Sequence, residues 1–221
     1  MNFARRVAQL LGRGGSGRES TRWVVVDVET SGLDAQRDRL LAIAGVAVEL
    51  AGERPRIDVG DSFEVVLRQP TDGHAPDRDN ILLHGIGIGA QRAGVDPAEA
   101  LRAFERWVGA SPLVAFHSAF DETMIQRHCQ AVLGRRLPNA WADLALVAPV
   151  VAPQVRARTL DDWMQAYRIE CAVRHQAAAD TFATAELMLR LWPQIRAEAG
   201  SVKVDFTAMQ RLATQARWLQ R

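Results

Sequence analysis

The sequence has little cysteine and no long apolar run, and both absences narrow the classes of protein that it can encode. Its two cysteines, Cys129 and Cys171, are too few for a disulfide scaffold and lack the spacing of a metal site. No uninterrupted apolar stretch approaches the ~20 residues that cross a bilayer. The apolar stretch behind Arg5 and Arg6 is also too short for a signal peptide. We therefore expect a cytoplasmic protein with no membrane partner.

The charges are nearly balanced, which excludes a protein that binds nucleic acid as a general polycation. The 221 residues include 27 Lys and Arg against 26 Asp and Glu, for a formal net charge of +1. Hydrophobic residues make up 48% and charged residues 24%, values that are ordinary for a globular domain and exclude a disordered chain. Any affinity for nucleic acid must therefore come from a local site.

The chain divides into one large domain with an appendage at each end. Residues 1–22 read as a helical arm followed by a Gly-rich linker, 23–198 as the domain, and 199–221 as an amphipathic C-terminal helix. That last helix carries an apolar stripe of Phe206, Met209, Leu212 and Trp218. An apolar stripe has to be covered, so it either packs on the domain or joins a partner, such as a polymerase or a second copy of this chain.

The hydrophobic pattern predicts an α/β domain of the mixed-sheet kind. Three apolar segments joined by short connections predict an antiparallel meander of strands at 23–29, 40–50 and 61–69. A loop is expected at 70–80, where proline, glycine and aspartate accumulate. Strands and helices then alternate: helix 97–109, strand 113–116, helix 121–132, a strand running into a short helix over 141–151, and helices at 159–167, 179–196 and from about 205. The helix at 159–167 is expected to begin with Thr159 as its cap. The helix at 179–196 is expected to be kinked or to end near Pro193.

Two acids in the first strand suggest a metal site. Asp27 and Glu29 are two residues apart, so both side chains leave one face of the strand while the neighbouring valines face the other. Buried carboxylates need a countercharge, and hard divalent ions such as Mg²⁺ and Mn²⁺ prefer oxygen ligands. The alternative is a strand end that emerges into water with two solvated acids.

Two further acids and a histidine stand at positions where α/β proteins place functional groups. Asp121 follows the buried strand 113–116 and opens a helix, although capping that helix would also explain it. Asp180 begins the helix 179–196 on the side that carries its apolar stripe, where a solvated cap is a poorer explanation. His175 lies five residues earlier, and a histidine beside acids and a metal is a candidate general base.

Three segments that contain these residues resemble the exonuclease motifs of the DEDDh 3′–5′ exonucleases. This family is the branch of the ribonuclease-H-like superfamily that includes the proofreading epsilon subunit of bacterial DNA polymerase III. The segments, in order, are VVVDVETSGLD (24–34), VAFHSAFD (114–121) and RHQAAADTFATAELMLRL (174–191). ILLHGIG (81–87) and TLDDW (159–163) resemble further family segments, so the likeness covers about 23–196. It implies a ribonuclease-H-like mixed sheet, an antiparallel meander plus parallel strands, flanked by helices.

The resemblance also implies a role for each motif residue. Two Mg²⁺ or Mn²⁺ ions would be held by the four acids, with His175 as the base that completes the catalytic set of Asp27, Glu29, Asp121, Asp180 and His175. The second motif departs from the family's HNA pattern, because it has Phe116, His117 and Ser118 at those positions. The catalytic acid of that motif is retained.

A terminal-nucleotide pocket is implied as well. Thr30 would hold the 3′-terminal nucleotide through its hydroxyl or backbone, and Leu33 and His84 would line the pocket. Oligoribonuclease-like sequences have a methionine after the second acid, where this chain has Thr30. The difference favours DNA over RNA as the nucleic acid with a free 3′ end.

These features favour a freestanding 3′–5′ exonuclease that releases nucleoside 5′-monophosphates. Three other functions remain open at this point: an epsilon-like proofreading subunit within a polymerase complex, a non-catalytic nucleic-acid-binding module, and a nucleotide hydrolase on the same fold. Against the first, the region after residue 196 shows no obvious sliding-clamp motif. Against the second, the acids and His175 are intact.

Overall fold

A single five-stranded sheet with the order β3-β2-β1-β4-β5 forms the centre of the protein. The structure, a computed structural model, describes residues 21–219 except for 51–53, 71–77, 172 and 202–203. The expected N-terminal arm, 1–22, therefore lies outside the described residues except for its last two positions.

The first three strands form the antiparallel meander, and the last two continue the sheet in parallel beside the first strand. The antiparallel strands are β1 (Arg22–Thr30), β2 (Leu40–Glu49) and β3 (Arg56–Val66), and the parallel strands are β4 (Leu113–Ala115) and β5 (Trp141–Asp143). Because β4 pairs in parallel with β1, the carboxyl ends of β1, β4 and β5 lie at one edge of the sheet. The predicted mixed sheet is confirmed.

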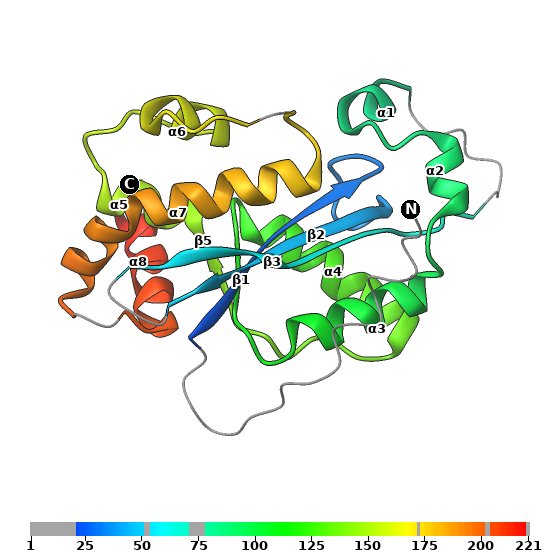
Figure 1. The fold of residues 1–221 in the computed structure, drawn as a ribbon, viewed down its shortest axis with the longest axis horizontal. Coiled ribbons are helices and arrows are strands. Elements are labelled where there is room, and N and C mark those ends of the chain that lie inside the picture. Colours follow the sequence, from blue (N-terminus) through cyan, green and yellow to red (C-terminus); the bar gives the residue numbers. More distant parts are fainter. Residues whose placement is uncertain (1–20, 51–53, 71–77, 172, 202–203, 220–221) are drawn as a thin grey trace.

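Helices cover both faces of this sheet (Figure 1). One face packs against α3 (Pro97–Val108) and α4 (Ser118–Leu133). The other packs against α5 (Leu144–Val151), α7 (Ala177–Ala199) and α8 (Phe206–Leu219), and α6 (Leu160–Tyr167) lies outside α7 (Figure 1). Two short helices, α1 (Arg78–His84) and α2 (Ile88–Ala93), stand beside the turn that follows β1 (Figure 1).

The alternation of side chains along β1 explains the two layers. Val24 and Val26 belong to the apolar core under α3 and α4, whereas Trp23 and Val25 belong to the core under α7. Gly45 lets a helix approach β2 closely, because a Cβ atom there would lie 2.7 Å from the Trp107 ring of α3. Both faces of the central strands are thus dry, as expected for strands covered by helices on each side.

The C-terminal helix packs on the domain itself. Met209 and Leu212 are fully buried against α5 and α7, and the Phe206 ring meets Trp23 edge-on at a centroid distance of 5.0 Å. The side chain of Trp218, the fourth residue of the predicted stripe, lies outside the described residues. Of the two expectations for this stripe, covering the domain is the one that its three described residues fulfil.

Three expectations about element boundaries were wrong. β3 begins at Arg56 rather than 61, and its pairing with β2 is interrupted between Val46 and Ala47. The expected loop 70–80 already contains the start of α1 at Arg78. Of the kink or end expected near Pro193, the end is wrong: α7 continues to Ala199, because the buried side chains around the proline hold it in place. Within the described residues, no helix combines the length and apolar character needed to cross a membrane.

Candidate active site

Asp27 and Glu29 lie near the carboxyl end of β1, on the face of the sheet toward α7. Both residues are only partly exposed, whereas Val28 between them points to the opposite core. The pairing with β2 shifts between Glu29 and Thr30. A β-bulge at the end of a central strand bends the chain and redirects the side chains next to it, here beside the two acids.

Asp121 reaches the same region from the first turns of α4. It is buried, with 4% of its surface exposed, and its carboxyl group hydrogen-bonds to the backbone of Val28. The helix begins at Ser118, shortly after β4 ends at Ala115, and its N-cap residue His117 is in the left-handed conformation with φ 64°. The tight turn from β4 into α4 therefore aims Asp121 at the carboxyl end of β1.

Asp180 and His175 come from the start of α7. Asp180 is 7% exposed, and its Oδ2 accepts a hydrogen bond from the His175 backbone N–H at 3.2 Å. His175 itself has φ 60° and an exposed side chain. This arrangement fixes the backbone of His175 beside an acid while its imidazole stays open to solvent.

The charges of the four acids act on one another. Burial, together with the charges of Asp121, Glu29 and Asp180, raises the pKa of Asp27 well above its usual value. Burial and the charge of Asp180 raise the pKa of Glu29 to about 8. Burial also raises the pKa of Asp121, with a further contribution from the Asp143 charge. Carboxylates that raise one another's pKa lack countercharge, which a bound cation supplies.

The donor set fits a hard divalent cation, although the side chains are not arranged as a ready metal site. Within the described part of the chain, no three His, Cys, Asp or Glu side chains stand close enough to hold an ion as placed. The oxygen donors of Asp27, Glu29, Asp121 and Asp180 are nevertheless those that Mg²⁺ and Mn²⁺ prefer. The raised pKa values of Asp27, Glu29 and Asp121 are the observation that makes these three carboxylates suitable ligands, and Asp180 beside them is paired with Arg174.

Two residues of this region were not anticipated as parts of the site. Arg174 forms ion pairs with Asp161 and Asp180, and its charge lowers the pKa of both Asp27 and Glu29. Asp143 ends β5 and accepts hydrogen bonds from two backbone N–H groups, those of His117 at 3.0 Å and Ala145 at 2.9 Å. The sequence signal for Arg174 was a cation directly before the candidate base. The signal for Asp143 was a polar residue at the end of a parallel strand.

The unusual second motif is accommodated without disturbing its acid. Phe116, at the position of the family's histidine, packs against the core under α7 and meets the His117 ring edge-on at 4.8 Å. His117 adopts the left-handed turn, and Ser118 is the first residue of α4. The substitutions therefore alter the wall of the turn and leave Asp121 in place.

The three residues expected to bind the terminal nucleotide have different environments. The Thr30 hydroxyl donates to the Gly32 carbonyl at 2.6 Å, and the Thr30 carbonyl accepts from Asn80 of α1 at 2.7 Å. Leu33 is 92% exposed. His84 is buried, its Nδ1 accepts from the Ile86 N–H at 2.9 Å, and its Nε2 has no hydrogen-bond partner among the described residues.

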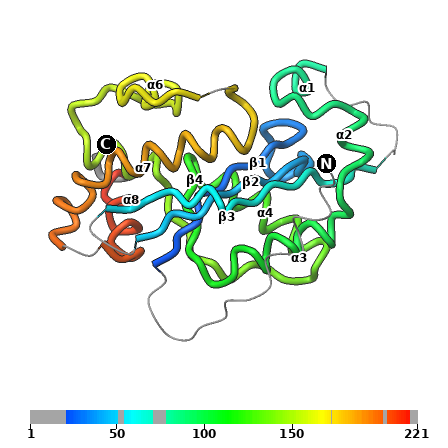
Figure 2. The backbone as a smooth tube through the Cα atoms, in the orientation of Figure 1, coloured from blue at the N-terminus to red at the C-terminus, as the bar shows by residue number. Residues whose placement is uncertain are grey.

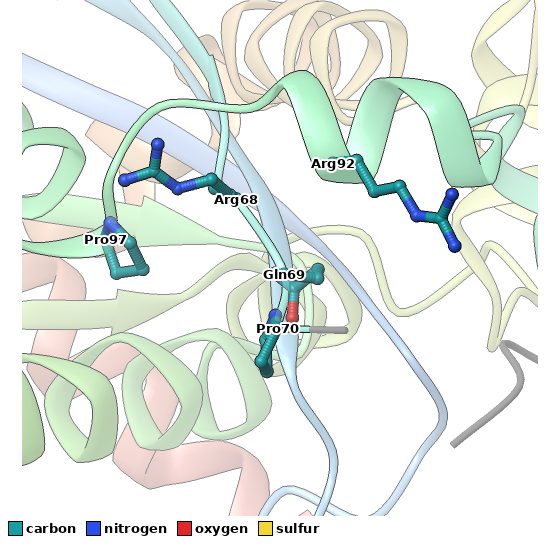
Figure 3. A pocket seen from close by; sticks show the side chains of 5 residues that line it. All are labelled: Arg68, Gln69, Pro70, Arg92 and Pro97. Carbon is teal, nitrogen blue, oxygen red and sulfur yellow. The ribbon is translucent and has the colours of Figure 1, made fainter. Parts of the chain in front are cut away.

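A cavity of about 490 Å³ lies away from the acids, at the end of β3. It is lined by Arg68, Gln69, Pro70, Arg92 and Pro97. In Figure 3 the Arg68 side chain extends toward Pro97, whereas Arg92 extends in the opposite direction. Arg68 is also paired with Asp96 at 2.9 Å, so these arginines do not converge on one ligand.

Comparison with known proteins finds matches over most of the chain. The RNase T family profile, described as "Exonuclease", matches residues 24–188. The PolC-type DNA polymerase III of Bacillus subtilis is 29% identical over 175 residues, which cover 78% of this chain and 12% of that protein. A DNA polymerase III subunit epsilon-like protein of Rhodobacter capsulatus is 29% identical over 197 residues, or 85% of this chain and 27% of that protein. The chain thus spans only a small part of these relatives.

Solved structures share the fold at low sequence identity. Escherichia coli Exonuclease I in complex with a dT13 oligonucleotide has a TM-score of 0.66 at 19% identity, over 82% of this chain and 44% of that one. Cell-death related nuclease 4 (CRN-4) has a TM-score of 0.67 at 13% identity, over 79% of this chain and 64% of that one. These likenesses establish the arrangement of sheet and helices.

Proposed function

Since this chain belongs to the RNase T family of exonucleases, we propose that it is a metal-dependent 3′–5′ exonuclease. It acts on single-stranded nucleic acid, with DNA preferred to RNA, and releases nucleoside 5′-monophosphates. The observation that carries this proposal is the meeting of acids from β1, α4 and α7 in one electrostatic cluster with His175 at its rim. A cytoplasmic location remains part of the prediction.

Each acid has a role in holding the ions. In the proposed site Asp27, Glu29 and Asp180 would hold the ions through their carboxylate oxygens, and Asp121 would do so directly or through water. Two Mg²⁺ or Mn²⁺ ions held there would neutralise the charge that develops on the scissile phosphate and on the attacking and leaving oxygens. The buried, mutually repelling carboxylates support this assignment because a cation relieves their repulsion.

His175 acts as the general base. Its backbone N–H donates to Asp180, so the backbone of His175 is held next to the acids, and its exposed side chain is open to a water molecule. An imidazole suits this task because its ordinary pKa is close to neutral pH. His175 thus takes the proton from the water that attacks the phosphate.

The polarity of the reaction follows from the terminal-nucleotide pocket. In the proposal Thr30, Leu33 and His84 surround the last nucleotide of the strand, beside the acids. Leu33 supports this placement because it offers an exposed apolar surface. His84 supports it because its Nε2 has no hydrogen-bond partner among the residues that the structure describes. Exonuclease I in its complexes with dA16 and dT13 is a structural neighbour that binds single-stranded DNA.

The test is a 5′-labelled oligonucleotide resolved on a denaturing gel beside a circular single strand. We expect a descending ladder, no cleavage of the circle, and slower cleavage when the strand ends in a 3′-phosphate. Cleavage of the circle would indicate an endonuclease, and cleavage of free nucleotides alone would indicate a nucleotide hydrolase. DNA and RNA of the same sequence, compared at equal salt, measure the preference between them.

A second candidate function is an epsilon-like proofreading subunit of a polymerase complex. The observation that favours it is the similarity to PolC-type polymerases and to the epsilon-like protein. If it is correct, the full chain should co-elute with a replicative polymerase subunit in gel filtration. A chain that stays separate from polymerase yet shortens oligonucleotides would indicate the freestanding enzyme. A non-catalytic module would bind the oligonucleotide and leave its length unchanged.

A further inference from the structure

Arg174 connects the start of α6 with the start of α7 across the segment that carries His175. Its Nε lies 2.5 Å from Oδ1 of Asp161, and its Nη2 lies 3.4 Å from Oδ2 of the same carboxylate. On its other side the guanidinium forms an ion pair with Asp180 through Nη1. The side chain is 24% exposed, so the guanidinium is partly enclosed between the two acids.

The Asp161 end of this bridge stands on a well-fixed helix start. Thr159 caps α6 by accepting from the Asp162 N–H at 3.1 Å, and Asp162 in turn accepts from the Thr159 N–H at 2.9 Å. This reciprocal arrangement satisfies the free N–H groups of the first turn and holds its conformation. Asp161 is therefore a stable anchor that lies outside the cluster of metal-binding acids.

The other end of the bridge adjoins a backbone conformation that needs support. His175 has φ 60°, a left-handed value that is unfavourable for a residue with a Cβ atom unless its surroundings enforce it. One restraint is the hydrogen bond from its N–H to Asp180. His175 lies in the connection between α6 and α7, the two helices that Figure 2 labels one above the other. The residue on the N-terminal side of His175 is Arg174.

We propose that Arg174, held by Asp161, is a positioning residue that keeps His175 in its left-handed turn beside the acids. The inference rests on the proposed role of His175 as general base. The Asp161 pair restrains the backbone before His175, and the Asp180 hydrogen bond restrains His175 itself. Together these two restraints fix the Cα position of His175, whose side chain has to remain exposed to meet water.

The geometry also explains why this position holds an arginine. A guanidinium has donors on several edges, so it bonds to Asp161 through two nitrogens while a third faces Asp180. A lysine ammonium is a point charge on a flexible stem and retains the charge without the two-point contact. Arg174→Lys should therefore restore only part of what Arg174→Ala removes.

The principal test is Asp161→Asn, because it removes the anchor while leaving Arg174 and all proposed metal ligands in place. At saturating Mn²⁺ we expect kcat to fall about tenfold with little change in KM, as small displacements of a catalytic group do. Arg174→Ala should give a similar loss, and the double variant should lose no more than either single one. The matched control is Glu186→Gln on α7, which breaks the 2.7 Å ion pair between Glu186 and Arg190. This variant should leave kcat unchanged.

A measurement without metal or substrate separates positioning from a general loss of stability. Compared with the wild type, amide hydrogen exchange at His175 in EDTA should be faster in Asp161→Asn and unchanged in Glu186→Gln. The wild type and the two variants should have equal melting temperatures. Unchanged kcat in both Asp161→Asn and Arg174→Ala would overturn the inference, as would unchanged exchange at His175. Full activity of His175→Ala would instead refute the proposed function, whichever result the Asp161 variant gives.

Discussion

The carboxylates of Asp121 and Asp180 act on Asp27 from helices that cover opposite faces of the sheet. Asp121 lies on α4, whose core residues pack under one face, and Asp180 lies on α7, which packs on the other. Both charges raise the pKa of Asp27. The two helices therefore meet electrostatically at the carboxyl end of β1, where ligand sites of α/β sheets commonly form.

Removing one acid should abolish turnover and leave the fold intact. In Asp27→Ala a buried charge and its repulsion disappear, so the melting temperature in EDTA should stay equal or rise. In Asp180→Ala the ion pair with Arg174 and the hydrogen bond from the His175 N–H are lost, so the melting temperature in EDTA should fall modestly. Mn²⁺ should raise the melting temperature of the wild-type protein and have a smaller effect on either variant. Thermal scans with a Mn²⁺ titration measure this. Full activity of either variant would refute the site assignment.

His175→Ala should reduce the rate and spare the metal. Loss of a general base lowers kcat by about 10²–10⁴-fold, while the affinity for Mn²⁺ should be unchanged because His175 is not among the proposed ligands. Single-turnover cleavage and isothermal titration with Mn²⁺ provide the two values. A collapse of Mn²⁺ affinity would make His175 a ligand and contradict the mechanism.

The C-terminal helix should contribute to stability and leave the chemistry unaffected. Met209 is fully buried in the core shared with α7, so Met209→Ala should lower the free energy of unfolding by about 2–4 kcal/mol. Arg211→Ala, at an exposed position of the same helix, is the control and should change it little. Urea unfolding measures the difference. An equally stable Met209→Ala protein would mean that α8 does not pack as described.

Acid should weaken the contact between α4 and β2 through His128. Its Nε2 accepts from the Leu40 N–H at 3.2 Å, and burial with the nearby Arg127 charge lowers its pKa below 6.5. Because the folded state disfavours the protonated ring, this contribution is complete above pH 6.5 and is lost as pH falls through the lowered pKa. His128→Gln should show a flatter decline of stability between pH 7 and 5. An identical pH profile would contradict this role.

The motif residues could be predicted because their spacing follows local rules. Alternation along β1 placed Asp27 and Glu29 on one face, and the helix cap at Thr159 appeared as expected. The short helices α1 and α2 were missed because seven and six residues form too few turns to give a periodic signal. They depend on contacts such as that between Asn80 and the Thr30 carbonyl, which only the folded chain supplies.

The bridge formed by Arg174 illustrates what a linear pattern does not contain. Its partner Asp161 is thirteen residues earlier, in another helix, and the choice among nearby acids is made by the packing of α6 on α7. Pro193 is similar, since local propensity favours an interruption there. The buried Trp192 and Ile195 keep α7 helical beyond it. Tertiary packing decides both outcomes.

The contact between α8 and β5 has a consequence for self-association. β5 is an outer strand of the sheet, and its Trp141 carbonyl accepts a hydrogen bond from Gln210 of α8 at 3.0 Å. An uncovered outer strand is a template to which another chain can add its own strand. By occupying that carbonyl and lying alongside a strand of only three residues, α8 removes the template. The helix that completes the core thereby also closes the β5 edge of the sheet to strand addition.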